Sequence, residues 1–167
     1  LAFFLLFSLN SYGAGAKIDI PKYDWSWKGF FGTYDRASAQ RGLKVYREVC
    51  AGCHSMNYLA YRNLGDLGFS EDHIKAIAAE HLILDGPDDE GEMFERDGIP
   101  SDQFANPYPN VKAARAANNG AYPPDLSLIV KARPKGADYV KALLLGYVDP
   151  PEDMKVPKGQ HYNKYMA

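Results

Sequence analysis

The sequence predicts a mainly α-helical domain in which long loops join the helices. Four segments favour helix, prolines and glycines interrupt the stretches between them, and no convincing pair of strands is evident in the pattern. The 167 residues suffice for one domain with a core and are too few for two. Because long loops are unusual in a small domain, we expect a bound group to supply part of the core.

The first helix is expected at residues 36–49, with Asp35 as its N-cap. Its apolar positions recur at helical spacing: Ala39, Leu43, Tyr46 and Cys50. Residues 17–34, which precede it, are rich in aromatic side chains and glycine. That composition suits an extended segment laid over a core or a partner.

Three further helices follow. The second is expected at residues 71–84, where an apolar stripe follows two acidic residues that suit the positive end of the helix dipole. A short, alanine-rich third helix lies between Asn110 and Gly120, and a fourth spans residues 138–145. Residues 85–97, between the second and third helices, are expected to form an acidic loop.

Composition excludes two classes of protein. The formal net charge of -2 argues against a nucleic-acid-binding protein, which normally carries a basic face. The chain has only two cysteines, Cys50 and Cys53, and they lie three residues apart. No other cysteine could complete a bridge, so a disulfide scaffold is excluded.

The start of the chain resembles the end of a secretory signal peptide, since an apolar run is followed by small residues at an A-x-A-like site. The run is too short to span a bilayer, which needs roughly 20 apolar residues. A buried N-terminal element or a longer membrane anchor is the alternative. We expect residues 1–16 to be a signal-peptide remnant, cleaved after Ala16, and residues 17–167 to form one exported domain.

Residues 50–54 read Cys-Ala-Gly-Cys-His, the C-x-x-C-H pattern of c-type haem attachment. Two thiols at this spacing reach two vinyl groups of one porphyrin, and the histidine places a ring nitrogen over the iron. We therefore predict one covalent haem c on Cys50 and Cys53, with His54 as the proximal iron ligand. A thioredoxin-like pair would need a βαβ context, and a zinc site would need a second cysteine pair.

The sixth iron ligand is harder to assign, because an electron carrier usually takes a methionine or a second histidine there. The candidates are Met56, Met93, Met154, Met166, His73, His81 and His161. Met56 is too near His54 to reach the opposite face of the ring. Spacing alone leaves the other candidates open.

Longer strings around the motif are more specific than the motif itself. They read RGLKVYREVCAGCHSMNYLAYR at 41–62, GPDDEGEMFERDGIPSDQF at 86–104, AARAANNGAYPPDLS at 113–127, DYVKALLLGYVDPP at 138–151 and HYNKY at 161–165. Together they closely resemble the cytochrome c1 family, the haem subunits of ubiquinol–cytochrome c oxidoreductase (the cytochrome bc1 complex). The resemblance covers nearly all of residues 17–167.

The resemblance implies a cytochrome c-type monohaem domain, anchored in full length by one C-terminal membrane helix. The domain would lie on the periplasmic side of a bacterial inner membrane, or on the intermembrane-space side in mitochondria. It would take an electron from the Rieske iron–sulfur protein, beside the cytochrome b subunit, and pass it to a soluble cytochrome c. Such a redox subunit has no catalytic acid or base of its own.

The resemblance also implies site residues beyond the motif. Asn118, Pro124, Arg133 and Tyr139 match positions that line the haem pocket in the family, and Arg133 matches a residue that pairs with a propionate. In the family the axial methionine follows the Tyr-Asn-x-Tyr string by a few residues. Met166 does not align with it, so the sixth-ligand methionine and the membrane helix are expected beyond Ala167.

Two features leave alternatives open. The seven carboxylates of residues 85–97 could be a solvated loop or a surface that steers a basic electron acceptor. For the whole chain, a free soluble c-type cytochrome that shuttles electrons is the alternative function. A haem-based sensor with an open iron position is the third candidate function.

Overall fold

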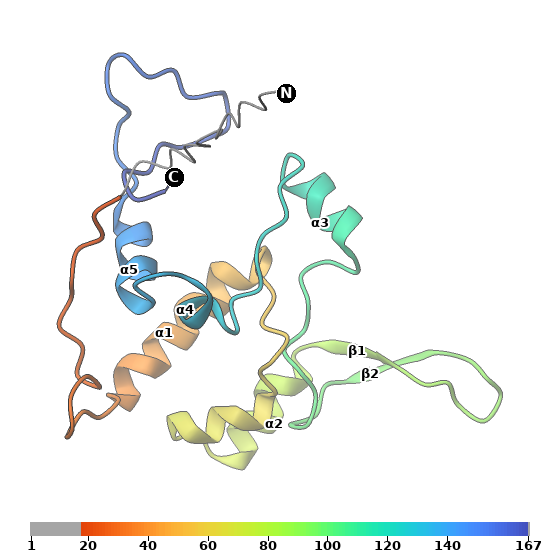
Figure 1. Cartoon of the computed structure of the whole chain (residues 1–167). Helices are drawn as coiled ribbons and strands as arrows, with labels where there is room; N and C mark the ends of the chain where they lie inside the picture. The colour runs from red at the N-terminus through yellow and green to blue at the C-terminus, as the bar shows by residue number, and fades with distance from the viewer. Residues whose placement is uncertain (1–17, 167) are drawn as a thin grey trace, which may run out of the picture. The chain divides into compact units, whose positions relative to one another are not determined.

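The computed structural model describes residues 18–166, which fall into two compact units (Figure 1). Residues 23–136 form the larger unit. Residues 18–22 and 137–166 form the smaller one. The expected signal-peptide remnant, residues 1–16, lies outside the described residues. Within residues 18–166 no helix is both long and apolar enough to cross a bilayer.

Helix α1 (Arg36–Glu48) begins where the sequence predicts. The Asp35 side chain accepts a hydrogen bond from the Ser38 N–H at 3.2 Å, which satisfies one of the free donors of the first turn. The chain then tightens into the short 3₁₀ helix η1 (Cys50–Gly52). The motif therefore starts directly at the end of α1.

A small core lies between α1, the 3₁₀ helix η2 (Tyr61–Leu67) and α2 (Glu71–Ala79). Its buried side chains are Tyr46, Tyr61, Leu64, Ile74, Ile77, Ala78 and Phe104. The Tyr61 and Phe104 rings stack with their centroids 4.7 Å apart. Ser70 caps α2 by accepting from the His73 N–H, as its place before the apolar stripe suggests.

The stretch after α2 corrects the sequence-based expectation of a helix to residue 84 and a loop at 85–97. Helix α2 ends at Ala79, and β1 (Leu82–Asp85) pairs antiparallel with β2 (Phe94–Asp97), Leu82 opposite Asp97. The three apolar residues at 82–84 continue the stripe of α2 in the sequence, so periodicity over so few residues could not separate strand from helix. Figure 1 shows the hairpin extending away from α2.

Arg96 fastens the base of this hairpin. Its guanidinium lies 2.5 Å from Asp85 Oδ2 and donates to both carboxylate oxygens of Asp102, at 2.7 and 2.9 Å. The bonds to Asp102 and Asp85 raise the pKa of Arg96, and the same bonds hold the pKa values of both carboxyl groups below their ordinary value. The fork of donors explains why one arginine can hold two acidic segments.

Two short helices complete the larger unit. Helix α3 (Val111–Ala117) occupies the predicted place, and the Asn110 side chain caps it by accepting from the Ala113 N–H at 3.0 Å. Helix α4 (Ile129–Ala132) was not predicted, because a single turn carries no readable periodicity.

The smaller unit is built on α5 (Ala137–Leu145), the predicted fourth helix. Asn163 is buried beside its end, where its Nδ2 donates to the Leu143 carbonyl at 2.7 Å and its Oδ1 accepts from the Tyr165 N–H at 2.9 Å. A Cβ at Gly146 would lie only 2.4 Å from Asn163 Oδ1, so only glycine fits this approach. Asn163 thus folds the C-terminal segment back onto α5.

The core of the larger unit yields a matched test. Leu64 is 1% exposed and Leu84 is 65% exposed. We expect Leu64→Ala to lower the free energy of unfolding by about 2–5 kcal/mol, because it leaves a cavity. Leu84→Ala should change it by less than about 0.5 kcal/mol. Denaturant titration of both variants measures this, and equal effects would contradict the assigned core.

Candidate functional site

The C-x-x-C-H segment forms a tight turn at the end of α1. The Cys50 carbonyl accepts from the N–H groups of both Cys53 and His54, at 3.1 and 2.9 Å. Cys50 is half-buried, Cys53 is exposed, and both thiols are free. The turn therefore presents two unbridged thiols and an imidazole from five consecutive residues.

The His54 ring is oriented by a residue far away in the sequence. Its Nδ1 lies 2.8 Å from the Pro124 carbonyl oxygen. A carbonyl oxygen only accepts, so Nδ1 must carry the proton and donate. In the neutral ring this leaves the Nε2 lone pair free, the arrangement that a metal-binding histidine requires.

A set of hydrogen bonds joins the residues after His54 to the residues after Pro124. The Asp125 carboxylate accepts from Ser55 Oγ and from the Asn57 N–H, both at 2.8 Å. Ser127 Oγ accepts from the Tyr58 N–H at 3.0 Å, and the Leu126 N–H donates to the Ser55 carbonyl at 2.9 Å. We call residues 55–58 and 124–127, with these bonds, the clamp.

Asp125 is ionised when the clamp is formed. Burial by itself would raise its pKa, but hydrogen bonds from the Asn57 N–H and from Ser127 and Ser55 outweigh burial and hold the pKa at about 2. Its other oxygen, Oδ1, accepts from the Ser127 N–H at 2.8 Å. A carboxylate that accepts three such bonds suits this place because it has only acceptors to offer.

Tyr46 supports the same turn from the core. Its hydroxyl donates to the His54 carbonyl at 3.2 Å. Burial, with the nearby charge of Asp125, raises the pKa of Tyr46 to about 12. Tyr46 therefore stays protonated and links the hydrophobic core to the motif.

Asn118 is also near the motif, through Tyr108. Its Nδ2 donates to Tyr108 Oη at 3.1 Å and to the Ala114 carbonyl at 2.8 Å, and Tyr108 Oη lies 3.8 Å from Cys53 Sγ. Cys53 and Tyr108 line a hollow of about 140 Å³ together with Tyr122. Asn118 thus fixes a phenol beside one of the two thiols.

The other residues predicted from the sequence lie elsewhere. Arg133 directly follows α4 and its side chain is exposed. Tyr139 lies on α5, in the smaller unit. Among the contacts of residues 23–136, none brings Arg133 to the motif.

The alternative ligands of the larger unit have other surroundings. The Nδ1 of His73 lies 3.1 Å from Ser70 Oγ, and the His81 ring stacks on Tyr61 with centroids 5.9 Å apart. Met56 packs against the core, whereas Met93 is exposed on the hairpin.

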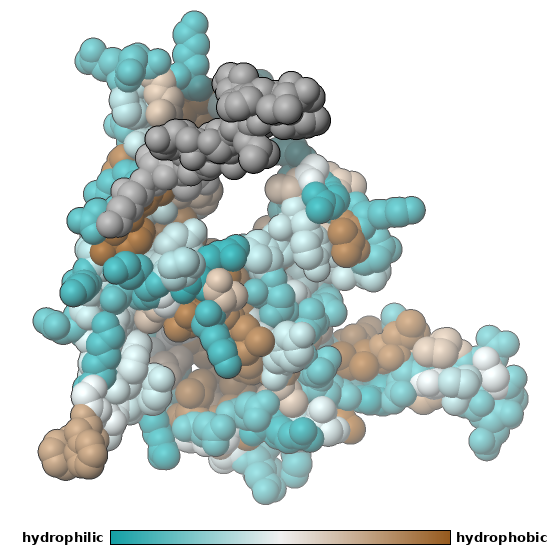
Figure 2. Space-filling model, viewed as in Figure 1, coloured by the Kyte–Doolittle hydropathy of each residue, from teal (hydrophilic) through white to brown (hydrophobic). Residues whose placement is uncertain are grey.

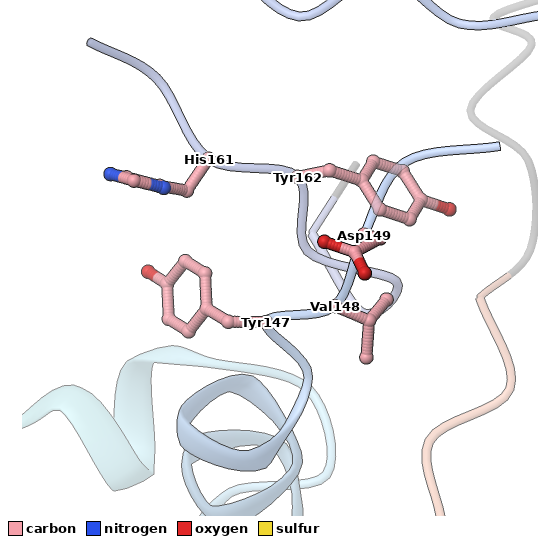
Figure 3. A pocket seen from close by; sticks show the side chains of 5 residues that line it. All are labelled: Tyr147, Val148, Asp149, His161 and Tyr162. Atoms are coloured by element: carbon pink, nitrogen blue, oxygen red, sulfur yellow. The ribbon is translucent and has the colours of Figure 1, made fainter. Parts of the chain in front are cut away.

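His161 lines a hollow of about 680 Å³ in the smaller unit, with Tyr147, Val148, Asp149 and Tyr162. Figure 3 shows the rings of Tyr147 and His161 on one side of the two backbone segments and the Tyr162 ring on the other. Met154 and Met166 are both exposed in this unit. Among residues 18–166 no group of three or more His, Cys, Asp or Glu side chains could hold a metal ion.

The motif fits a covalently held haem on its own geometry. Both thiols are free, the His54 Nε2 lone pair is available, and Val49 beside Cys50 is 71% exposed. Tyr122, which lines the hollow beside Cys53, is 45% exposed. Apolar side chains left uncovered near the motif offer the surface that a porphyrin ring would cover.

Comparison with known proteins decides the family. A model described as the Cytochrome C1 family matches residues 25–167. The chain belongs to the cytochrome c1 family. Both the family and the c-type cytochrome fold predicted from the sequence are therefore confirmed.

Curated relatives of this cytochrome c1 family member come from plants, bacteria and fungi. It is 53% identical to the "Cytochrome c1-2, heme protein, mitochondrial" of Solanum tuberosum, over 89% of this chain and 57% of that protein. It is 57% identical to the "Cytochrome c1" of Rhodospirillum rubrum, over 78% of this chain and 48% of that protein. It is 52% identical to the "Cytochrome b-c1 complex catalytic subunit, mitochondrial" of Candida albicans, over 87% of this chain and 51% of that protein. The chain spans about half the length of these relatives.

The sequence-based reasoning missed the clamp of this family member. Asp125, Ser55 and Ser127 were not among the predicted site residues, although residues 123–127 (Pro-Pro-Asp-Leu-Ser) lie in the most specific string. An aspartate side chain often accepts from the backbone N–H two residues further on, as Asp125 does from Ser127. What that signal could not give is the partner segment, which lies about seventy residues earlier.

The lowered pKa of Asp125 predicts a pH dependence. Its folded-state pKa of about 2 lies below the ordinary value, so the carboxylate stabilises the fold above about pH 4. That contribution is lost as pH falls from about 4 through about 2. We expect the unfolding free energy of Asp125→Asn to depend less on pH in this range than that of the wild type, measured by denaturant titration. Parallel curves would contradict the assigned contacts.

Proposed function

We propose that this chain carries one haem c, held by thioether bonds from Cys50 and Cys53 and by iron ligation from His54. When bound, such a haem accepts and gives up one electron at a time. The observation that carries the proposal is the hydrogen bond from His54 Nδ1 to the Pro124 carbonyl, which leaves Nε2 for the iron. The two free thiols on the same turn support it.

The residues of this chain hold and orient the haem rather than perform acid–base chemistry. His54 binds the iron, Pro124 fixes the imidazole, and Asn118 positions Tyr108 beside Cys53. By their match to the family alone, Arg133 is proposed to pair with a propionate and Tyr139 to line the haem pocket. The sixth ligand stays open: within residues 18–166, Met56 packs against the core, and Met93, Met154 and Met166 are exposed.

The haem domain serves as the electron-transfer subunit of a membrane-bound quinol–cytochrome c oxidoreductase. It takes an electron from the Rieske iron–sulfur protein, next to the cytochrome b subunit, and passes it to a soluble cytochrome c on the periplasmic or intermembrane-space side. Family membership supports this role, as does a relative named as a subunit of the cytochrome b-c1 complex.

Haem attachment is tested with the two cysteines. In cells that attach haem c, the wild type should keep one haem after denaturation in acid acetone. Cys50→Ser and Cys53→Ser should each keep it through one thioether, with a shifted absorption band in alkaline pyridine, and the double variant should lose it. The intact mass and the pyridine spectrum measure both outcomes. A wild-type chain without a mass increment would contradict the proposal.

The tip of the β1–β2 hairpin carries the acidic residues expected to steer a basic acceptor. Asp89, Glu90 and Glu92 are exposed there. Asp88 has another role, because its Oδ1 accepts from the Glu90 and Glu92 N–H groups and so shapes the turn. Figure 2 shows hydrophilic colour at the tip and apolar colour along the strands. The tip thus presents clustered negative charge away from the core.

Steering is tested by neutralising the tip. The triple variant Asp89→Asn, Glu90→Gln, Glu92→Gln should slow oxidation by a basic cytochrome c several-fold at low salt and converge with the wild type at high salt, because screening removes long-range attraction. Stopped-flow rates over a range of ionic strength measure this.

The matched control removes three exposed carboxylates elsewhere, in the variant Asp19→Asn, Asp24→Asn, Glu152→Gln. It changes the net charge equally and should slow oxidation less. Equal slowing in the two variants would assign the effect to overall charge. If neither variant is slowed, the hairpin tip has no steering role.

A further inference from the structure

Asp125 is the residue through which the clamp acts on the proximal histidine. The carbonyl that orients His54 belongs to the peptide bond between Pro124 and Asp125, which is planar. The direction of that carbonyl is therefore tied to the backbone of Asp125. Whatever holds Asp125 in place also holds the acceptor of the His54 N–H.

The prolines cannot fix this carbonyl alone. The ring of Pro124 restricts its φ angle, whereas the rotation that turns its carbonyl is ψ, which the ring leaves open. Contacts of the next two residues restrict this ψ angle. The Asp125 carboxylate is held by Ser55 and Asn57, and the Leu126 N–H is held by the Ser55 carbonyl. Ser55 directly follows His54, so the clamp ties both partners of the His54–Pro124 bond together.

The chemistry of the clamp requires a carboxylate. Asp125 Oδ2 accepts from a hydroxyl and a backbone N–H, and Oδ1 accepts from the Ser127 N–H. An asparagine in its place would direct an NH₂ group at one of these donors, so at least one bond would be replaced by a repulsive contact. Ser55 is 8% exposed, which makes an unmade bond costly there.

We propose that Asp125 is a positioning residue for the haem iron: it holds the Pro124 carbonyl on His54 Nδ1 and thereby sets the strength with which His54 donates to the iron. This inference rests on the proposed function, since it assigns a residue to the proximal side of the same site. A hydrogen-bonded imidazole is a stronger donor, and stronger donation favours ferric iron. Loosening the clamp should therefore raise the reduction potential.

The first test uses Asp125→Asn in the haem-loaded protein. We expect the His54 ring N–H to exchange with solvent about tenfold faster, its NMR resonance to move, and the reduction potential to rise. Asp66→Asn, an exposed carboxylate on η2, is the control for the loss of one negative charge. The control should leave the ring N–H signal in place. Unchanged ring N–H exchange in Asp125→Asn would overturn the inference.

A milder variant covers the case in which Asp125→Asn does not fold. Ser127→Ala removes the acceptor of the Tyr58 N–H and weakens the hold on Asp125 without altering its charge. It should move the ring N–H exchange and the potential in the same direction, by less. If Ser127→Ala folds and changes neither, the inference is wrong.

Failure of the inference is distinct from failure of the proposed function. A wild-type chain that binds no haem contradicts the proposed function. A haem-loaded wild type whose ring N–H exchange and potential match those of Asp125→Asn contradicts only the role of Asp125. Amide exchange at Asn57, whose N–H donates to Asp125, reports the loosening of the clamp without reference to the haem.

Discussion

The hydrogen bond from His54 Nδ1 to the Pro124 carbonyl joins two segments that are 70 residues apart in the chain. Closing so long a loop costs entropy, and a single bond would not hold it. The Asp125 carboxylate and the neighbouring bonds of the clamp share that cost, because they fasten the same two segments along four residues each. The orientation of the His54 ring depends on this junction more than on the helix that precedes it.

The remaining parts of the larger unit are arranged around that junction. The core of α1, η2 and α2 anchors the motif from one side, and Tyr46 connects the two by donating from the core to the His54 carbonyl. The hairpin is fastened separately, by Arg96 between Asp85 and Asp102. Substitutions at the acidic tip can therefore alter surface charge without loosening the contacts of His54.

The sequence predicted those features whose causes are local. Helices α1 and α3 begin after Asp35 and Asn110, because each of these residues caps the first turn with its own side chain. The hairpin was missed because residues 82–84 continue the apolar stripe of α2. What makes them a strand is pairing with residues that follow ten or more positions later and the bond from Arg96 to Asp85.

The sequence by itself determined the family and predicted the attachment of haem at residues 50–54. Two thiols and an imidazole at fixed spacing have few other uses, and the strings around them are specific. Only the tertiary structure decided how His54 is oriented and that Asp125, Ser55 and Ser127 take part. The physical reason is that a covalent attachment site is a property of neighbouring residues. The partner of a hydrogen bond is chosen by whatever the fold brings within 3 Å.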